Sequence, residues 1–197
     1  MGEEKVSLVI ENLCKKFSEK VIFENFSYDF PQKGICVLVG KSGRGKTTLL
    51  RIISGIDKEY TGSVVADTAS YAFQEYRLFP VLTALENVTK ILWEKPTEQQ
   101  RLAAEAILRT LGFSDSDMAL YPNALSGGMK QRVSLCRAFL AETKLLLLDE
   151  PFKELDNALC EQLRVLLKNE AEKRLIILTA HNLDILGDLE KTVITLD

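Results

Sequence analysis

Gly40-Lys41-Ser42-Gly43-Arg44-Gly45-Lys46-Thr47 is the stretch of this sequence that decides the fold. It fits the pattern G-x-x-x-x-G-K-[ST]. An apolar run typical of a buried strand precedes it at residues 35–39, and apolar residues at helical spacing follow it at residues 49–53. A strand, a glycine-rich loop and a helix in this order predict a phosphate-binding loop, because the backbone N–H groups and the positive helix N-terminus both attract an anion.

The residue types within this loop indicate that ATP binds there together with Mg²⁺. The Lys46 ammonium would reach the β- and γ-phosphates, and the Thr47 hydroxyl is a hard oxygen ligand suited to Mg²⁺. The residues that we expect to contact ATP here are Gly40, Lys41, Ser42, Gly43, Arg44, Gly45, Lys46, Thr47 and Thr48. An ordinary glycine-rich turn would match the four fixed positions in only about 1% of such chains. A dinucleotide-binding loop is disfavoured because its spacing G-x-G-x-x-G is not satisfied.

Two adjacent carboxylates follow the apolar run at residues 145–148. Such a run predicts a parallel strand that is buried on both faces, with its carboxyl end at the ligand crevice. Side chains alternate along a strand, so we expect Asp149 to hold Mg²⁺ through water and Glu150 to polarise the attacking water. The alternative is an acidic pair that only opens the turn before Pro151. The nearby phosphate loop favours the catalytic interpretation.

Six segments occur in a characteristic order along the chain. They are the phosphate loop, Gln74, Leu125-Ser126-Gly127-Gly128, Asp149-Glu150, Leu155-Asp156 and His181. Over nearly its whole length, the chain thereby resembles the nucleotide-binding subunits of ATP-binding-cassette (ABC) transporters. The resemblance implies that ATP is held between two such chains arranged head to tail, one providing the phosphate loop and the other the signature around Ser126. A single copy should therefore be nearly inactive.

The signature also fits the missing half of an anion site. Ser126 offers a hydroxyl, and Gly127 and Gly128 offer unobstructed N–H groups at the start of a helix predicted from Met129 to Leu140. We expect them to donate to the γ-phosphate of the other chain's nucleotide. For Ser-Gly-Gly alone, an ordinary helix cap with flexible glycines would be the default interpretation.

Three further site residues depend on the resemblance. It implies that His181 contacts the γ-phosphate and takes part in catalysis with Glu150 and Lys46, that Gln74 touches Mg²⁺, and that Phe17 stacks on adenine. A lone histidine is more often an ordinary surface or core residue. Gln74 could equally be a plain amide at a strand end, and Phe17 could belong to the core.

Composition agrees with one cytosolic domain. The 197 residues are 46% hydrophobic and 27% charged with a net charge of −3, which allows one sizeable core and gives no electrostatic indication of nucleic-acid binding. We find neither a leader sequence nor a run long enough to cross a bilayer. The widely separated cysteines, at positions 14, 36, 136 and 160, are expected to be free thiols.

We therefore predict an α/β fold, with a RecA-like P-loop NTPase core, an antiparallel β subdomain and an inserted α-helical signature subdomain. Residues 1–74 and 143–197 would form the nucleotide-binding core of a single domain, and residues 75–142 the helical subdomain. Expected strands include residues 6–10, 21–30, 175–179 and 192–196. Expected helices include residues 83–93, with a capping box at Thr83, residues 98–111 and residues 157–170.

The resemblance also implies partners. A membrane-spanning permease would insert a helix into a groove lined from Glu75 to Pro80, and a second ATPase subunit, expected to be an identical copy, would complete the site. A solute-binding protein would act indirectly. The sequences of residues 73–88 and 125–132 are most similar to those of ATPases of nitrate, sulfonate and taurine importers. This places the chain in the cytoplasm, on the inner face of the cell membrane.

Three departures from the family pattern are visible. The segment from Arg51 to Phe73 is short, so the antiparallel region should be trimmed. Lys153-Glu154 replaces a pair of small residues near the expected dimer interface. The last predicted strand lies close to Asp197, so we expect no C-terminal regulatory domain. Two alternatives stay open: a cassette ATPase that serves DNA repair or translation, and a P-loop kinase of small metabolites.

Overall fold

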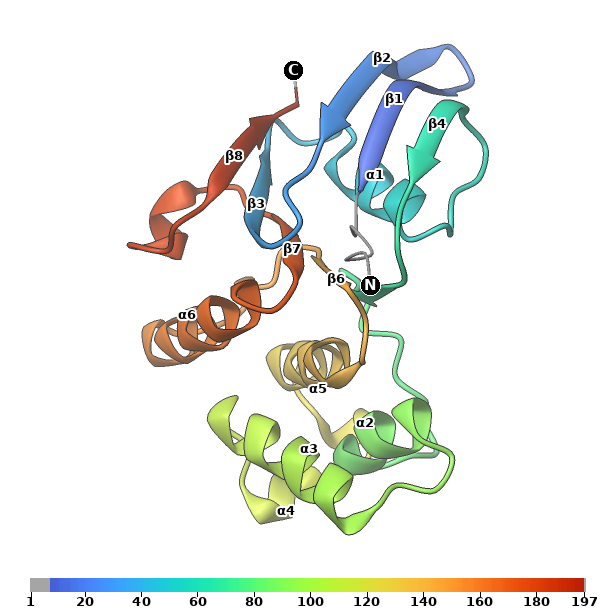
Figure 1. Ribbon diagram of the computed structural model, residues 1–197. Helices are drawn as coiled ribbons and strands as arrows, with labels where there is room; N and C mark the ends of the chain where they lie inside the picture. Colours follow the sequence, from blue (N-terminus) through green and yellow to red (C-terminus); the bar gives the residue numbers. More distant parts are fainter. Residues whose placement is uncertain (1–7, 197) are drawn as a thin grey trace, which may run out of the picture.

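A computed structural model describes residues 8–196 (Figure 1). Its first part is an antiparallel sheet with strand order β2-β1-β4. The strands are β1 (Val9–Phe17), β2 (Lys20–Asp29) and β4 (Thr61–Val65). The first predicted strand, at residues 6–10, lies partly outside the described residues, and β1 continues well beyond the predicted end. The predicted antiparallel region is confirmed.

The second sheet is parallel throughout, with strand order β5-β6-β7-β3-β8. Its strands are β3 (Gly34–Val39), β5 (Ala69–Ala72), β6 (Leu145–Leu148), β7 (Leu175–Thr179) and β8 (Thr192–Thr195). Every residue of β6 and β7 is buried, which explains their continuous apolar runs. The predicted α/β fold is confirmed, and the segments after β3, β5, β6 and β7 all emerge at the carboxyl edge of one sheet.

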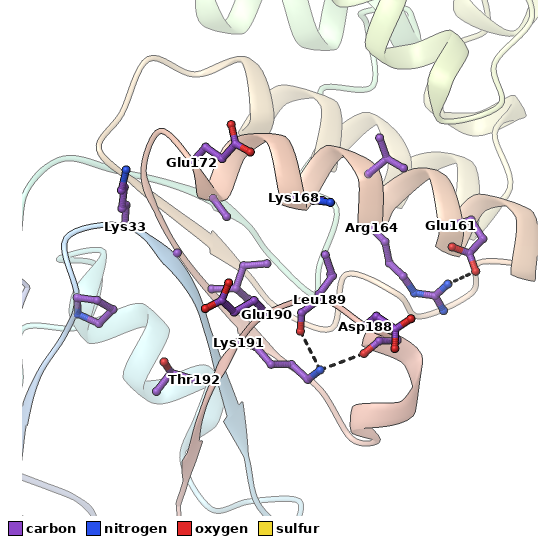
Figure 2. Close-up of a pocket in the computed structure, with 16 residues that line it drawn as sticks. Lys33, Glu161, Arg164, Lys168, Glu172, Asp188, Leu189, Glu190, Lys191 and Thr192 are labelled. Carbon is purple, nitrogen blue, oxygen red and sulfur yellow. Dashed lines mark hydrogen bonds and ion pairs between the residues drawn. The ribbon is translucent and has the colours of Figure 1, made fainter.

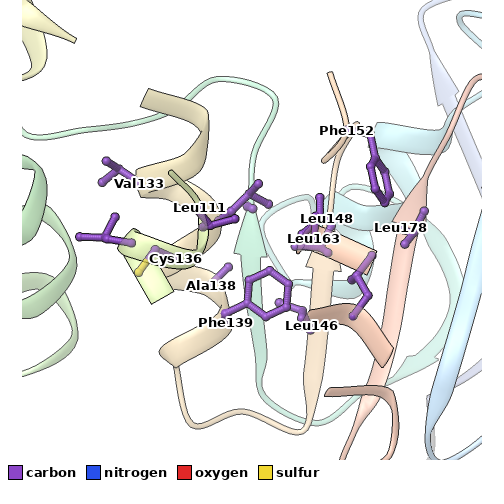
Figure 3. Close-up of a cluster of buried hydrophobic side chains, with 14 of the residues drawn as sticks. Leu111, Val133, Cys136, Ala138, Phe139, Leu146, Leu148, Phe152, Leu163 and Leu178 are labelled. Carbon is purple, nitrogen blue, oxygen red and sulfur yellow. The ribbon is translucent and has the colours of Figure 1, made fainter. Parts of the chain in front are cut away.

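Alternate residues of the parallel sheet pack into two different cores. On one face, Leu145 and Leu147 join the cluster that contains α1 (Lys46–Ile53) and the antiparallel sheet. On the other face, Leu146 and Leu148 join the helices. Figure 3 shows this second cluster, in which Phe139 lies beside Leu146 and Leu163 lies close to Leu148. The sheet is thus covered on both faces.

The remaining helices form a lobe and a cover for the sheet. They are α2 (Ala84–Leu92), α3 (Glu98–Thr110), α4 (Asp115–Met118), α5 (Gly127–Leu140) and α6 (Asn157–Ala171), with short 3₁₀ helices η1 (Pro122–Ala124) and η2 (Leu183–Leu186). In Figure 1, α2, α3 and α4 lie far from the antiparallel sheet, and α5 lies between them and β6. The capping box at Thr83 is confirmed. The exact boundaries 75 and 142 of the lobe stay a prediction.

The predicted start of the signature helix was wrong by two residues. Helix α5 begins at Gly127 because the Ser126 hydroxyl accepts a hydrogen bond from the Met129 N–H at 3.2 Å, which makes Ser126 the N-cap. The glycines therefore belong to the first helical turn, where N–H groups lack partners within the helix.

The four cysteines are free thiols, as predicted. Burial raises the pKa of the Cys36 thiol to about 11 and also raises the pKa of Cys136. Both thiols are therefore protonated at neutral pH and act as small apolar side chains.

Arg174 connects the C-terminal end of α5 to the core through hydrogen bonds. It lies just before β7, is 7% exposed, and donates to the backbone oxygens of Phe139 at 2.6 Å and Ala141 at 2.9 Å. Its Nε donates to the Glu170 carboxylate at 2.9 Å. One buried guanidinium thus satisfies carbonyl groups left free at the end of the signature helix.

Arg174→Met should destabilise the protein by about 3 kcal/mol, because it leaves buried backbone carbonyls without their donor and removes the more buried partner of Glu170. The matched control is Lys173→Met, since Lys173 also pairs with Glu170 but has a side chain that is 67% exposed. The control should lose no more than about 0.5 kcal/mol. Urea unfolding measures both free energies, and equal losses would contradict the role assigned to Arg174.

Candidate functional site

The phosphate loop lies between β3 and α1, and two of its glycines pack closely against neighbouring segments. Gly40 has a φ of 150°, and a Cβ added there would lie 2.4 Å from the Leu196 backbone oxygen. Gly45 caps α1 with a φ of 91°, and an added Cβ would lie 2.5 Å from Ile22 Cγ2 and 2.8 Å from Phe23 Cζ. Both positions therefore exclude any larger residue.

The Lys46 ammonium lies inside this loop. It donates to the backbone oxygens of Gly40 at 2.7 Å and Lys41 at 3.2 Å, and the residue is 7% exposed. Residues 41–44 are exposed, so the outer part of the loop is open to a ligand. A second cation, Lys20 of β2, donates to the Gly43 oxygen at 3.1 Å and was missed by the sequence analysis. This cradle of glycine backbone and ammonium groups fits the phosphates of ATP.

Asp149 and Glu150 follow the end of β6 at Leu148 and occupy different environments. Asp149 is 4% exposed; its Oδ1 accepts from the Thr179 hydroxyl at 2.8 Å and its Oδ2 from the Tyr71 hydroxyl at 3.3 Å. Burial, followed by the charge of Asp149, raises the pKa of Tyr71, so its phenol stays protonated and donates. Neither Tyr71 nor Thr179 was predicted as a site residue.

Glu150 turns away from the strand and meets His181. Its φ is 52°, its side chain is 18% exposed, and its Oε1 lies 2.7 Å from His181 Nε2. The backbone oxygen of Glu150 accepts from Gln131 of α5 at 2.9 Å. Two residues predicted to be catalytic are therefore in direct contact, although 31 positions separate them in sequence. The unusual Lys153 adds an ammonium 3.7 Å from Glu150 Oε2.

The signature lies apart from the phosphate loop. Ser126 is exposed at the start of α5, and a Cβ added at Gly127 would lie 2.7 Å from Glu154 Oε2. Glu154 also accepts from the Tyr76 hydroxyl at 3.4 Å. Within residues 8–196, no hydrogen bond or ion pair joins the signature to the phosphate loop. The signature and the phosphate loop are thus separate from each other within one copy of the chain.

Phe17 and Gln74 lie near the ends of strands. Phe17 ends β1 and is 49% exposed, so it is not a core residue. Its ring lies 4.7 Å from the Lys15 ammonium and lines a cavity of about 490 Å³ together with Thr48. Gln74 is exposed two residues after β5. Contacts of Phe17 with adenine and of Gln74 with Mg²⁺ stay predictions.

The protein groups that could hold Mg²⁺ are few. In the described part of the chain, no three His, Cys, Asp or Glu side chains converge as a metal site. Mg²⁺ often takes only one or two protein ligands and completes its shell with phosphate oxygens and water. The donor set predicted from sequence, Thr47, Gln74 and Asp149, consists of oxygen donors of the kind that such a site uses.

A larger cavity of about 860 Å³ lies elsewhere (Figure 2). It is lined by α6, the segment around Asp188 and the start of β3 at Gly34, whereas the phosphate loop follows the end of β3. Its charged residues are Lys33, Glu161, Arg164, Lys168, Glu172, Asp188, Glu190 and Lys191. Because both signs are balanced, this cavity has no electrostatic preference for a nucleotide.

A family model described as "ABC transporter" matches residues 23–153. This segment includes the phosphate loop, the signature and the Asp149–Glu150 pair. The chain belongs to the ABC transporter family. It is therefore an ATP-binding cassette protein, which confirms the resemblance drawn from its six motifs. Among residues 8–196, no helix has the length and apolar character that crossing a membrane requires.

Several named proteins are similar to this cassette. The "Aliphatic sulfonates import ATP-binding protein SsuB" of Corynebacterium glutamicum is 40% identical over 77% of this chain and 63% of its own length. The SsuB protein of Bacillus cereus is 35% identical over 91% of this chain and 76% of its own length. The "Sulfate/thiosulfate import ATP-binding protein CysA" of Burkholderia mallei is 39% identical over 81% of this chain and 50% of its own length. The cassette thus spans between half and about three quarters of these relatives.

Two solved structures share the fold. The dimeric bacterial ABC transporter cassette MJ0796 is 26% identical with a TM-score of 0.84, covering 95% of this chain and 94% of that one. The same cassette in a dimeric post-hydrolysis state with ADP and Pi is 28% identical with a TM-score of 0.85, covering 96% and 94%. The predicted fold is confirmed by these likenesses.

Gly45→Ala should abolish measurable ATP binding, because its Cβ would collide with β2 and force the loop out of shape. The control is Gly55→Ala, since Gly55 also has a positive φ of 71° but has no atom within 4 Å of an added Cβ. It should lose only about 1 kcal/mol of stability and keep its affinity for ATP. Titration with a fluorescent ATP analogue and thermal unfolding distinguish the two, and equal affinities would contradict the steric argument.

Proposed function

We propose that this cassette hydrolyses ATP and that hydrolysis powers the import of a small solute through a membrane-spanning permease. The observation that carries the proposal is the 2.7 Å contact between Glu150 and His181 at the carboxyl edge of the sheet that also presents the phosphate loop. Similar proteins named for import support transport over DNA repair or translation. A small-molecule kinase would leave the signature and His181 without a role.

In the proposed reaction, each protein group has one task. Lys46 and the loop N–H groups hold the phosphates, and bound Mg²⁺ would neutralise charge that develops on them. Glu150 orients and polarises the attacking water, and His181 holds the Glu150 carboxylate while contacting the γ-phosphate. Asp149 and Thr47 supply oxygen ligands toward the metal. Ser126, Gly127 and Gly128 act on the nucleotide of a second copy.

We propose that two copies close on ATP and reopen after hydrolysis, and that a permease converts this motion into alternating access. The dimeric state of the similar cassettes supports this arrangement. The permease would hold the cassette at the cytoplasmic face of the membrane and contact the segment from Glu75 to Pro80, where Phe79 is 50% exposed. A solute-binding protein would deliver the solute, and no nucleic acid would take part. Since similar proteins are named for sulfonates, sulfate and thiosulfate, a sulfur oxyanion is the first solute class to test.

Purification of the tagged cassette from its native membranes in mild detergent tests the transport assignment. Mass spectrometry should identify a multi-span permease in stoichiometric amount. Recovery with ribosomes or DNA instead would overturn the transport proposal while leaving ATP hydrolysis to be measured separately.

Glu150→Gln should keep ATP affinity within about threefold, because the amide has nearly the shape of the carboxylate. Turnover should fall at least about 100-fold, since the amide is a poor acceptor for the proton of the attacking water. The control Glu142→Gln changes an exposed glutamate before β6 and should retain wild-type turnover. Phosphate release measures the rates, and a wild-type rate in Glu150→Gln would exclude the role of this carboxylate.

A further inference from the structure

The Thr179 hydroxyl lies between the two acidic residues of the site, although it belongs to none of the sequence motifs. Thr179 is the last residue of β7 and is 1% exposed. Its Oγ1 accepts from the Glu150 N–H at 2.8 Å and donates to Asp149 Oδ1 at 2.8 Å. The direction of both bonds is unambiguous, because a backbone N–H can only donate and the hydroxyl has one proton to give to the carboxylate.

Glu150 needs such support for its backbone. A φ of 52° lies in the left-handed region, which is unfavourable for a residue with a side chain. Its N–H is held by Thr179 and its C=O by Gln131 Nε2 at 2.9 Å, so both sides of the residue are fixed. This conformation directs the Glu150 carboxylate to His181.

The Asp149 carboxylate is fixed by the same hydroxyl. Thr179 donates to Oδ1, while Tyr71 donates to Oδ2 at 3.3 Å from the neighbouring strand β5. With both oxygens hydrogen-bonded, the carboxylate plane cannot rotate freely. Partners of this kind orient metal-binding groups, and their loss typically costs about 10–100-fold in metal affinity or activity.

We infer that Thr179 is a positioning residue for ATP hydrolysis: its single hydroxyl sets the Asp149 carboxylate and the Glu150 backbone relative to each other. Thr179 is buried, and both hydrogen bonds of its hydroxyl are made to protein groups. The inference rests on the proposed ATPase function and adds a residue that acts through the two carboxylates.

Thr179→Val tests this role, because valine has nearly the same shape but forms neither hydrogen bond. With ATP and Mg²⁺, at protein concentrations where specific activity no longer rises, kcat should fall at least about tenfold while the KM for ATP changes less than about twofold. Thr179→Ser keeps the hydroxyl and should restore kcat to within about threefold of wild type. If Thr179→Val does not fold, Thr179→Ala removes the same bonds without filling the space, and the same results are expected.

The control is Thr143→Val at the opposite end of β6. The Thr143 hydroxyl donates to the Leu145 backbone oxygen at 2.9 Å and lies at the other edge of the sheet. This variant should keep wild-type kcat. Urea unfolding of all variants separates a loss of stability from a loss of turnover.

A second measurement does not depend on turnover. Mn²⁺ titration in the presence of a non-hydrolysable ATP analogue, followed by electron paramagnetic resonance, should show Mn²⁺ affinity reduced several-fold in Thr179→Val and restored in Thr179→Ser. Unchanged kcat and Mn²⁺ affinity in Thr179→Val would overturn the inference, as would equal losses of kcat in Thr143→Val. If the wild-type chain hydrolyses no ATP, the proposed function fails, and the Mn²⁺ titration alone then decides whether Thr179 positions Asp149.

Discussion

The burial of one parallel sheet on both faces is the constraint on which the site depends. Residues of β6 and β7 alternate between two apolar cores, so neither face of the sheet can carry polar chemistry. Polar groups can appear only where strands end, and parallel pairing brings these ends to one edge. The phosphate loop, Gln74, the Asp149–Glu150 pair and His181 therefore gather there, although they come from distant parts of the sequence.

The same constraint explains why adjacent carboxylates behave differently. Asp149 continues the direction of β6 and remains buried, and each of its oxygens accepts one hydrogen bond from a hydroxyl. Glu150 leaves the strand through a left-handed backbone conformation and reaches the exposed His181. One carboxylate is thereby buried and held at both oxygens, and the other faces the exposed His181. The proposed transfer of a phosphoryl group to water requires such a division of tasks.

Sequence patterns predicted the residues proposed to contact the ligand but not the residues that support them. The phosphate loop is a local motif, and the strand carrying Asp149 is visible as an apolar run, so both could be placed from sequence. Tyr71 and Thr179 meet Asp149 only because β5 and β7 flank β6, and this strand order has no local signal. Lys20 contacts the loop only because β2 lies beside it in the folded protein, and no local pattern in the sequence indicates this contact. The start of α5 was misplaced because glycine is a poor helix former, whereas the Ser126 cap includes both glycines in the first turn.

The turn from Pro151 to Asp156 links the Glu150 carboxylate to the signature of the same chain. Within it, Lys153 lies 3.7 Å from the Glu150 carboxylate, which in the proposed reaction serves the chain's own nucleotide. One residue later, Glu154 packs against Gly127 of the signature, which in the proposed dimer serves the nucleotide of the other copy. Gln131 adds a bond from the signature helix to the Glu150 backbone. Displacement of α5 would therefore disturb the catalytic carboxylate directly, so the geometry of one ATP site depends on how the same chain engages the other.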